Sequence, residues 1–154
     1  VFTAFFNSFV FDFTLRQSIG GTHLNKYILK QLPMPTPEDV EEFTVQTNNT
    51  NETLNDFLNN RGQKLIWTSH SLDSLGDGLD PSSGPYSWDE SERRTLRAEI
   101  DGAIAQVYDI PRDDFAYILD QFEILKDREN KEYGEYRTKK DCLAAFDKIE
   151  VNSD

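Results

Sequence analysis

The second half of the chain repeats apolar residues at helical spacing, and this pattern constrains the fold more than any other feature. Ser87-Trp88-Asp89-Glu90 has the layout of a capping box, and Pro111 ends the helix that follows and opens another. A third helix is expected to begin near Thr138. The apolar positions in the three helices are Leu96, Ile100, Ala103, Ile104 and Val107; Phe115, Ile118, Leu119 and Phe122; and Cys142, Ala145, Phe146 and Ile149. Three helices with short connections predict a compact C-terminal helical domain over residues 63–154.

The start of the chain is strongly aromatic. Six of the eleven phenylalanines lie in its first segment, and five follow helical spacing: Phe2, Phe5, Phe6, Phe9 and Phe13. This stripe predicts one amphipathic helix that ends near Gly20-Gly21 and needs a partner surface. An aromatic face so concentrated at a terminus is more typical of the cut edge of a longer protein. We therefore expect a C-terminal fragment.

The middle of the chain is less regular. Residues 24–32 favour an extended or strand element, although their spacing also permits a helical turn or two, and prolines at alternate positions follow. Thr36 and Pro37 are typical of a helix start, and that helix is expected to reach about Val45. Residues 36–62 are interpreted as acidic, Asn-rich connecting helices or a linker, and residues 72–88 as a loop. The expected fold class is mainly α, with one small extended element.

The charge limits the function classes. The 154 residues suit a single domain, and a net charge of −12 argues against nucleic-acid binding through bulk electrostatics. Only residues 1–35 are net basic, with three basic side chains against one acidic. A single cysteine, Cys142, fits a reducing compartment, and no segment predicts a membrane span or a signal peptide. A cytoplasmic protein is expected.

The sequence offers little reactive chemistry. His23 and His70 are far apart and have no Cys or carboxylate at metal-ligand spacing. The acids of the loop that includes Asp73 and Asp77 do not follow the register of a calcium-binding loop. No phosphate-binding glycine loop and no nucleophile elbow are present. We therefore assign no catalytic residue, no metal site and no cofactor to this segment.

One polar segment has residue types that suit DNA. It runs from Arg16 to Lys30 around Gly20-Gly21, which lets the backbone approach a ligand closely. Arg, Gln and Asn side chains can pair with base edges, and lysines can bind phosphates. The candidate DNA-binding residues are Arg16, Gln17, Thr22, His23, Asn25, Lys26 and Lys30. The alternative is a helix C-cap followed by exposed polar residues.

A second mixed segment, residues 131–140, contains two tyrosines on either side of a glycine, next to several basic residues. Aromatic and basic side chains together can clamp nucleic acid. The interleaved Glu132 and Glu135 weaken that interpretation. Packing of Tyr133 and Tyr136 against the preceding helices is favoured.

Several of these motifs together resemble a known family. They are Asn7-Ser8-Phe9-Val10-Phe11-Asp12, Arg16-Gln17, Gly20-Gly21-Thr22-His23-Leu24-Asn25, Leu32-Pro33-Met34-Pro35, Trp67-Thr68, Trp88-Asp89-Glu90, Leu96-Arg97-Ala98-Glu99-Ile100-Asp101, Val107-Tyr108, Tyr117-Ile118-Leu119-Asp120 and Tyr133-Gly134-Glu135-Tyr136-Arg137-Thr138-Lys139. The first part resembles the end of the target-recognition region of large bacterial N6-adenine DNA methyltransferases, and the second part resembles their C-terminal tail. These enzymes belong to fused restriction-modification and phage-defence systems. Residues 38–64 match poorly.

The resemblance implies a role in DNA target recognition and scaffolding. Residues 1–35 would end the target-recognition region, and S-adenosylmethionine would bind an upstream methyltransferase domain, since its cofactor pocket and its Asn-Pro-Pro-Tyr type motif are absent here. The implied partners are that domain and double-stranded DNA, with no membrane. A parent enzyme of this family can also carry restriction activity. The alternative is a helical protein-interaction module, in which the Phe-rich helix forms a homodimer or binds another protein.

Overall fold

The computed structural model describes residues 1–19, 25–48, 50–76 and 85–153, and within these ranges the mainly helical class is confirmed. A small three-stranded antiparallel sheet accompanies the helices. In chain order the elements are α1 (Phe2–Phe6), α2 (Phe9–Ser18), α3 (Lys26–Leu29), α4 (Pro37–Glu42), β1 (Phe43–Gln46), β2 (Asn51–Thr53), α5 (Leu54–Ile66), the 3-10 helix η1 (His70–Gly76), α6 (Glu90–Val107), α7 (Arg112–Asp120), α8 (Glu123–Tyr133), α9 (Arg137–Phe146) and β3 (Glu150–Ser153).

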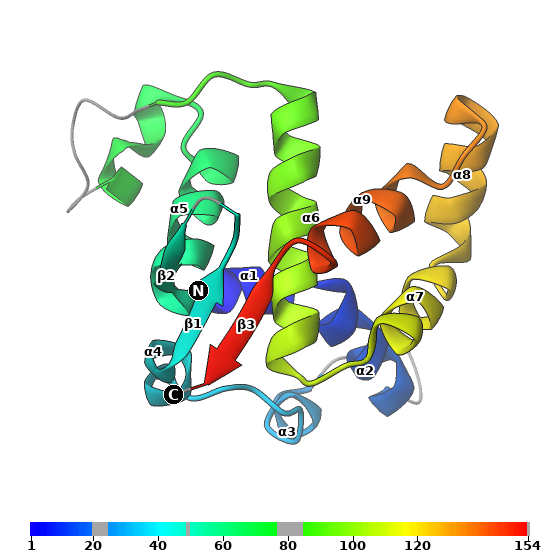
Figure 1. Cartoon of the computed structure of the whole chain (residues 1–154), viewed down its shortest axis with the longest axis horizontal. Helices are drawn as coiled ribbons and strands as arrows, with labels where there is room; N and C mark the ends of the chain where they lie inside the picture. Colours follow the sequence, from blue (N-terminus) through cyan, green and yellow to red (C-terminus); the bar gives the residue numbers. More distant parts are fainter. Residues whose placement is uncertain (20–24, 49, 77–84, 154) are drawn as a thin grey trace.

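Helix α6 crosses the middle of the molecule, with α5 on one side and α9, α7 and α8 on the other (Figure 1). Its closest neighbour is α9. At Gly102 the two backbones approach so closely that an added Cβ would lie 2.9 Å from the amide nitrogen of Phe146. A glycine is therefore required at this crossing for steric reasons rather than for an unusual φ.

The three helices expected in the C-terminal half are present, but two of them have other capping residues than expected. Asp89 caps α6, because its side chain accepts a hydrogen bond from the amide of Glu92 at 2.7 Å, so Ser87 is not the cap. Helix α9 begins at Arg137, and Thr138 instead donates its hydroxyl to Glu129 at 2.6 Å. Helix α8 was not predicted. It buries no residue completely, so it carries little apolar periodicity.

The single helix predicted at the start of the chain is wrong, because the structure divides this segment into α1 and α2. Ser8 separates them and caps α2, and its side chain accepts a hydrogen bond from the amide of Phe11. Phenylalanines at helical spacing continue through the break, so periodicity alone could not reveal it. Helix α2 ends at Ser18, and the predicted stop at Gly20-Gly21 lies outside the described residues.

The extended element predicted near residues 24–32 is wrong for the described residues 25–32, and the alternative of a helical turn is confirmed. Residues 26–29 form the one-turn helix α3, and the side chain of Asn25 caps it by accepting a hydrogen bond from the amide of Ile28 at 3.0 Å. The prolines restrict only the residues from Leu32 onward. A local cap therefore outweighs the β preference of Tyr27 and Ile28.

The sheet forms from segments for which the sequence predicts no strand. Helix α4 has the predicted cap at Thr36, with a reciprocal bond from Asp39, but it stops at Glu42 and residues 43–46 become the central strand β1. Strand β1 pairs antiparallel with β2 and with β3. Gln106 of α6 holds β3 in place, because its side chain accepts from the amide of Val151 and donates to the carbonyl of Ile149. Strands β2 and β3 were not predicted.

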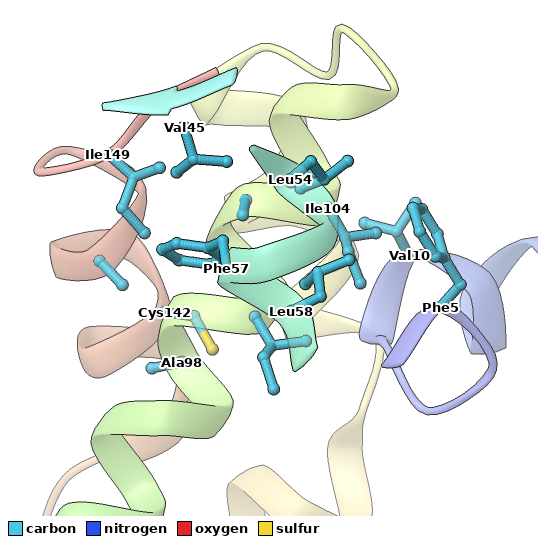
Figure 2. Close-up of a cluster of buried hydrophobic side chains, with 14 of the residues drawn as sticks. Phe5, Val10, Val45, Leu54, Phe57, Leu58, Ala98, Ile104, Cys142 and Ile149 are labelled. Atoms are coloured by element: carbon cyan, nitrogen blue, oxygen red, sulfur yellow. The ribbon is translucent and has the colours of Figure 1, made fainter. Parts of the chain in front are cut away.

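A continuous core joins the helices and the sheet. Figure 2 shows Phe57 and Leu58 of α5 beside Ile104 and Ala98 of α6, with Cys142 of α9 across from them. Leu54, Phe57 and Leu58 form the buried face of α5 within the Asn-rich stretch. The core cluster also includes Phe5, Val10, Val40, Val45, Ala103, Phe115, Leu119 and Ile149, so it takes residues from the first, middle and last parts of the chain.

The expected loop at residues 72–88 is only partly described. Its first residues belong to η1, and residues 77–84 lie outside the described ranges. In the described part of the chain no helix is both long enough and apolar enough to cross a membrane.

Candidate functional site

The predicted DNA-facing segment is free of acidic residues. No Asp or Glu occurs between Asp12 and Glu38, in a chain that has 28 such residues. Arg16, Lys26 and Lys30 lie in that interval. The local charge is therefore positive although the whole chain is strongly negative.

Arg16 is held by its neighbours. Its guanidinium donates to both carboxylate oxygens of Asp12, at 3.0 and 2.7 Å, and lies 4.9 Å from the ring centroid of Phe122. The hydrogen bonds with Asp12 raise the pKa of Arg16. Its side chain is still 61% exposed. One edge of the Arg16 guanidinium therefore stays accessible, although Asp12 compensates part of its positive charge.

Helix α3 presents two lysines without partners. Lys26 and Lys30 are both exposed and lie one helical turn apart. No described residue forms an ion pair or a side-chain hydrogen bond with either lysine. Tyr27 beside them is 71% exposed. Asn25 is used as the cap of α3, and Gln17 is exposed on α2. The remaining candidates, Thr22 and His23, lie outside the described residues.

Several side chains of the Phe-rich stripe pack against other parts of the molecule. Phe5 is buried, and the ring of Phe9 meets that of Phe122 edge to face at 4.7 Å. Phe2 and Phe6 remain 51% and 43% exposed. Self-association through this stripe stays a prediction, and it would depend on those two side chains.

In the second mixed segment, one tyrosine is packed and the other is exposed. Tyr136 donates its hydroxyl to the carbonyl of Leu119 at 3.0 Å, and burial raises its pKa, which confirms packing for this tyrosine. Tyr133 is exposed instead, and the guanidinium of Arg137 stacks over its ring at 3.7 Å.

The structure also reveals a site that was not predicted, an arginine-lined cleft of about 1100 Å³. It lies between α1, the start of α2, α5, α6, α8 and α9. Five of the eight arginines line it and none of the eight lysines does: Arg93, Arg94, Arg97, Arg128 and Arg137. In the sequence, only the group 93, 94 and 97 on one helix gave a signal, because Arg128 and Arg137 come from other helices.

A buried carboxylate also lines this cleft. Asp101 is 6% exposed, and its Oδ1 accepts a hydrogen bond from the amide of Phe9 at 2.8 Å, which fixes the start of α2 against α6. Burial raises the pKa of Asp101 to about 7. Cys142 lies on the same lining, and burial raises the pKa of its thiol well above the usual value. The thiol is therefore protonated at neutral pH and is not an activated nucleophile.

Neither region has the geometry of a metal centre. Among the described residues, no group of three or more His, Cys, Asp or Glu side chains could hold a metal ion. Comparisons of the chain with protein-family models, with curated proteins and with solved structures found no match.

Proposed function

We propose that this chain is a non-catalytic, DNA-contacting segment of an N6-adenine DNA methyltransferase of the restriction-modification and phage-defence type. The motifs quoted above support the family, and the interval without acidic residues supports the contact with DNA. The observation that carries the proposal is the exposed pair Lys26 and Lys30, which has no partner in the described structure. The site for S-adenosylmethionine and the catalytic residues belong to another part of the parent protein.

The contact would be made mainly with phosphates. Lysine is a flexible point charge that suits a phosphate oxygen, and two lysines one helical turn apart can bind neighbouring phosphates of one strand. Gln17 is exposed on α2 and can reach a base edge as a donor and as an acceptor. Arg16 would add a third contact through its exposed edge.

The rest of the chain limits this contact to one surface. The net charge of −12 repels duplex DNA from the other faces, so binding depends on the orientation of the basic segment. Binding by the isolated chain should therefore be weak and strongly sensitive to salt.

The proposal predicts that the double variant Lys26→Gln/Lys30→Gln binds duplex DNA several-fold more weakly than the unchanged chain at low salt. Each lost phosphate contact should reduce the slope of log K against log salt by about 1, so the slope should fall by about 2. Fluorescence anisotropy of a labelled duplex over a salt series measures both quantities.

The matched control is Lys131→Gln/Lys148→Gln, which removes the same charge from two exposed lysines outside the predicted DNA-facing segment. Equal salt slopes for the test and control variants would contradict the DNA-contact proposal. Methyl transfer from S-adenosylmethionine to DNA by the isolated chain would contradict the non-catalytic assignment.

A further inference from the structure

The arginine-lined cleft combines two kinds of surface. Arginines from α6, α8 and α9 border it, and apolar side chains form much of the remaining lining, among them Ala4, Phe9, Leu58, Leu65, Ile100 and Leu125. A hollow with apolar walls and a few convergent polar groups is the usual form of a small-molecule site. Its volume of about 1100 Å³ leaves room for such a ligand together with water.

Five carboxylates also line the cleft, and among the described residues they form ion pairs with two of its five arginines. Asp141 accepts two hydrogen bonds from Arg94, at 2.9 and 2.6 Å, and Glu90 lies 3.9 Å from Arg97. Glu129 is occupied by the amide and hydroxyl of Thr138, at 2.8 and 2.6 Å. Of the other two acids, Asp101 accepts from the amide of Phe9, and Glu132 lies beside Tyr133 and raises its pKa.

Three guanidinium groups therefore keep unused donors. Within the described ranges, Arg128 and Arg137 form no ion pair, and the guanidinium of Arg137 stacks on the ring of Tyr133. Arg93 is 7% exposed, stacks on Trp88 at 3.7 Å and donates to the carbonyl of Leu65, but its Nε has no hydrogen-bond partner. A buried unpaired donor is unfavourable for the fold, and the residue that carries it borders this cleft.

We propose that this cleft binds a small phosphate monoester that carries a flat apolar body. Arginine rather than lysine is the residue suited to planar, bidentate recognition of an anion with several oxygens. The phosphate would lie against Arg128 and Arg137, and the apolar body would cover Phe9, Leu65 and Leu125, whose side chains are only partly buried. This site is separate from α3 and does not depend on the proposed contact with DNA.

Phenyl phosphate is the probe that tests the proposal, and titration calorimetry of the full chain at pH 7.5 is the measurement. We expect saturable binding with a Kd of about 0.1–1 mM, a range typical of a ligand of this size. Phenol lacks the phosphate and inorganic phosphate lacks the apolar body, so each should bind at least about tenfold more weakly. Adenosine monophosphate and O-phosphotyrosine, compared in the same titration, distinguish a nucleotide source from an amino-acid source of the same chemistry.

The double variant Arg128→Gln/Arg137→Gln should weaken binding of phenyl phosphate about tenfold or more, the effect of losing charge-assisted hydrogen bonds. Arg128 is exposed and has no ion pair in the described structure, so folding should be preserved, and thermal unfolding checks this. Lys131→Gln/Lys148→Gln removes the same charge outside the cleft and should leave the affinity unchanged.

Four results would overturn the proposal. The first is an absence of saturable binding up to about 10 mM phenyl phosphate. The second is equal weakening by the cleft variant and its control, which indicates general attraction of anions. The third is equal affinity for inorganic phosphate and phenyl phosphate, which would show that the apolar body contributes nothing to binding. The fourth is a loss of duplex DNA binding in Arg128→Gln/Arg137→Gln as large as that in Lys26→Gln/Lys30→Gln, which would assign the cleft to the DNA-binding surface.

Discussion

Asp101→Asn is expected to raise the free energy of unfolding by up to about 4 kcal/mol at pH 8, and this gain should shrink toward zero near pH 4. The pKa of Asp101 is about 7 in the folded chain, against an ordinary value of 3.8, because the carboxyl is buried. An asparagine at this position has no charge to bury. Its side-chain oxygen can still accept the hydrogen bond from the amide of Phe9.

The sign follows from the proton balance. Between pH 4 and 7 the unfolded chain has released the proton of Asp101, but the folded chain still holds it. The free energy of unfolding of the unchanged protein therefore falls as the pH rises through this window. Asp120 and Asp147 act in the opposite direction. Hydrogen bonds with Lys139 and with Arg112 lower their respective pKa values, so the stability they contribute is lost only below the usual carboxyl range.

Urea unfolding of the two proteins at pH 4.5, 6 and 8 measures the effect. The control is Asp127→Asn, on the exposed face of α8, which should leave the pH dependence unchanged. Cys142 and Tyr136 feel the charge of Asp101, but burial keeps both protonated throughout this range. A stability difference between Asp101→Asn and the unchanged chain that is constant from pH 4.5 to 8 would contradict the assignment.

Gly102→Ala is expected to destabilise the fold by about 1–3 kcal/mol, through overpacking at the crossing of α6 and α9. The new Cβ would lie 2.9 Å from the amide nitrogen and 3.2 Å from the Cα of Phe146. Both are backbone atoms, so the contact can be relieved only if the two helices separate. For a chain of this size, each kcal/mol lowers the Tm by about 2–4 °C.

Gly62→Ala is the matched control, because Gly62 also lies inside a helix but has nothing within 4 Å of the new Cβ. Alanine favours the helix over glycine, so this variant should be up to about 1 kcal/mol more stable. The difference between the two variants therefore isolates the contact with α9. If both changes stabilise the chain equally, the close approach of α6 and α9 is wrong. Thermal unfolding followed by circular dichroism gives the comparison.

The predicted candidate residues have different roles in the structure. Lys26 and Lys30 were selected from residue type, and the structure leaves them exposed on α3. Asn25, selected for the same reason, is used as a helix cap. The sequence does not predict the arginine-lined cleft, because Arg94, Arg128 and Arg137 lie on three different helices, α6, α8 and α9, that border it. No spacing in the sequence expresses that arrangement.

The mainly helical class and the helices α6, α7 and α9 follow from the amino-acid sequence alone. Helical periodicity, caps and prolines act within a few residues, so they can be read directly along the chain. Only the tertiary structure decided that residues 43–46 pair with residues 150–153, that Asp101 is buried under Phe9, and that the arginines border one cleft. These features depend on contacts between residues far apart in sequence, whose stability comes from burial and pairing that no local pattern encodes.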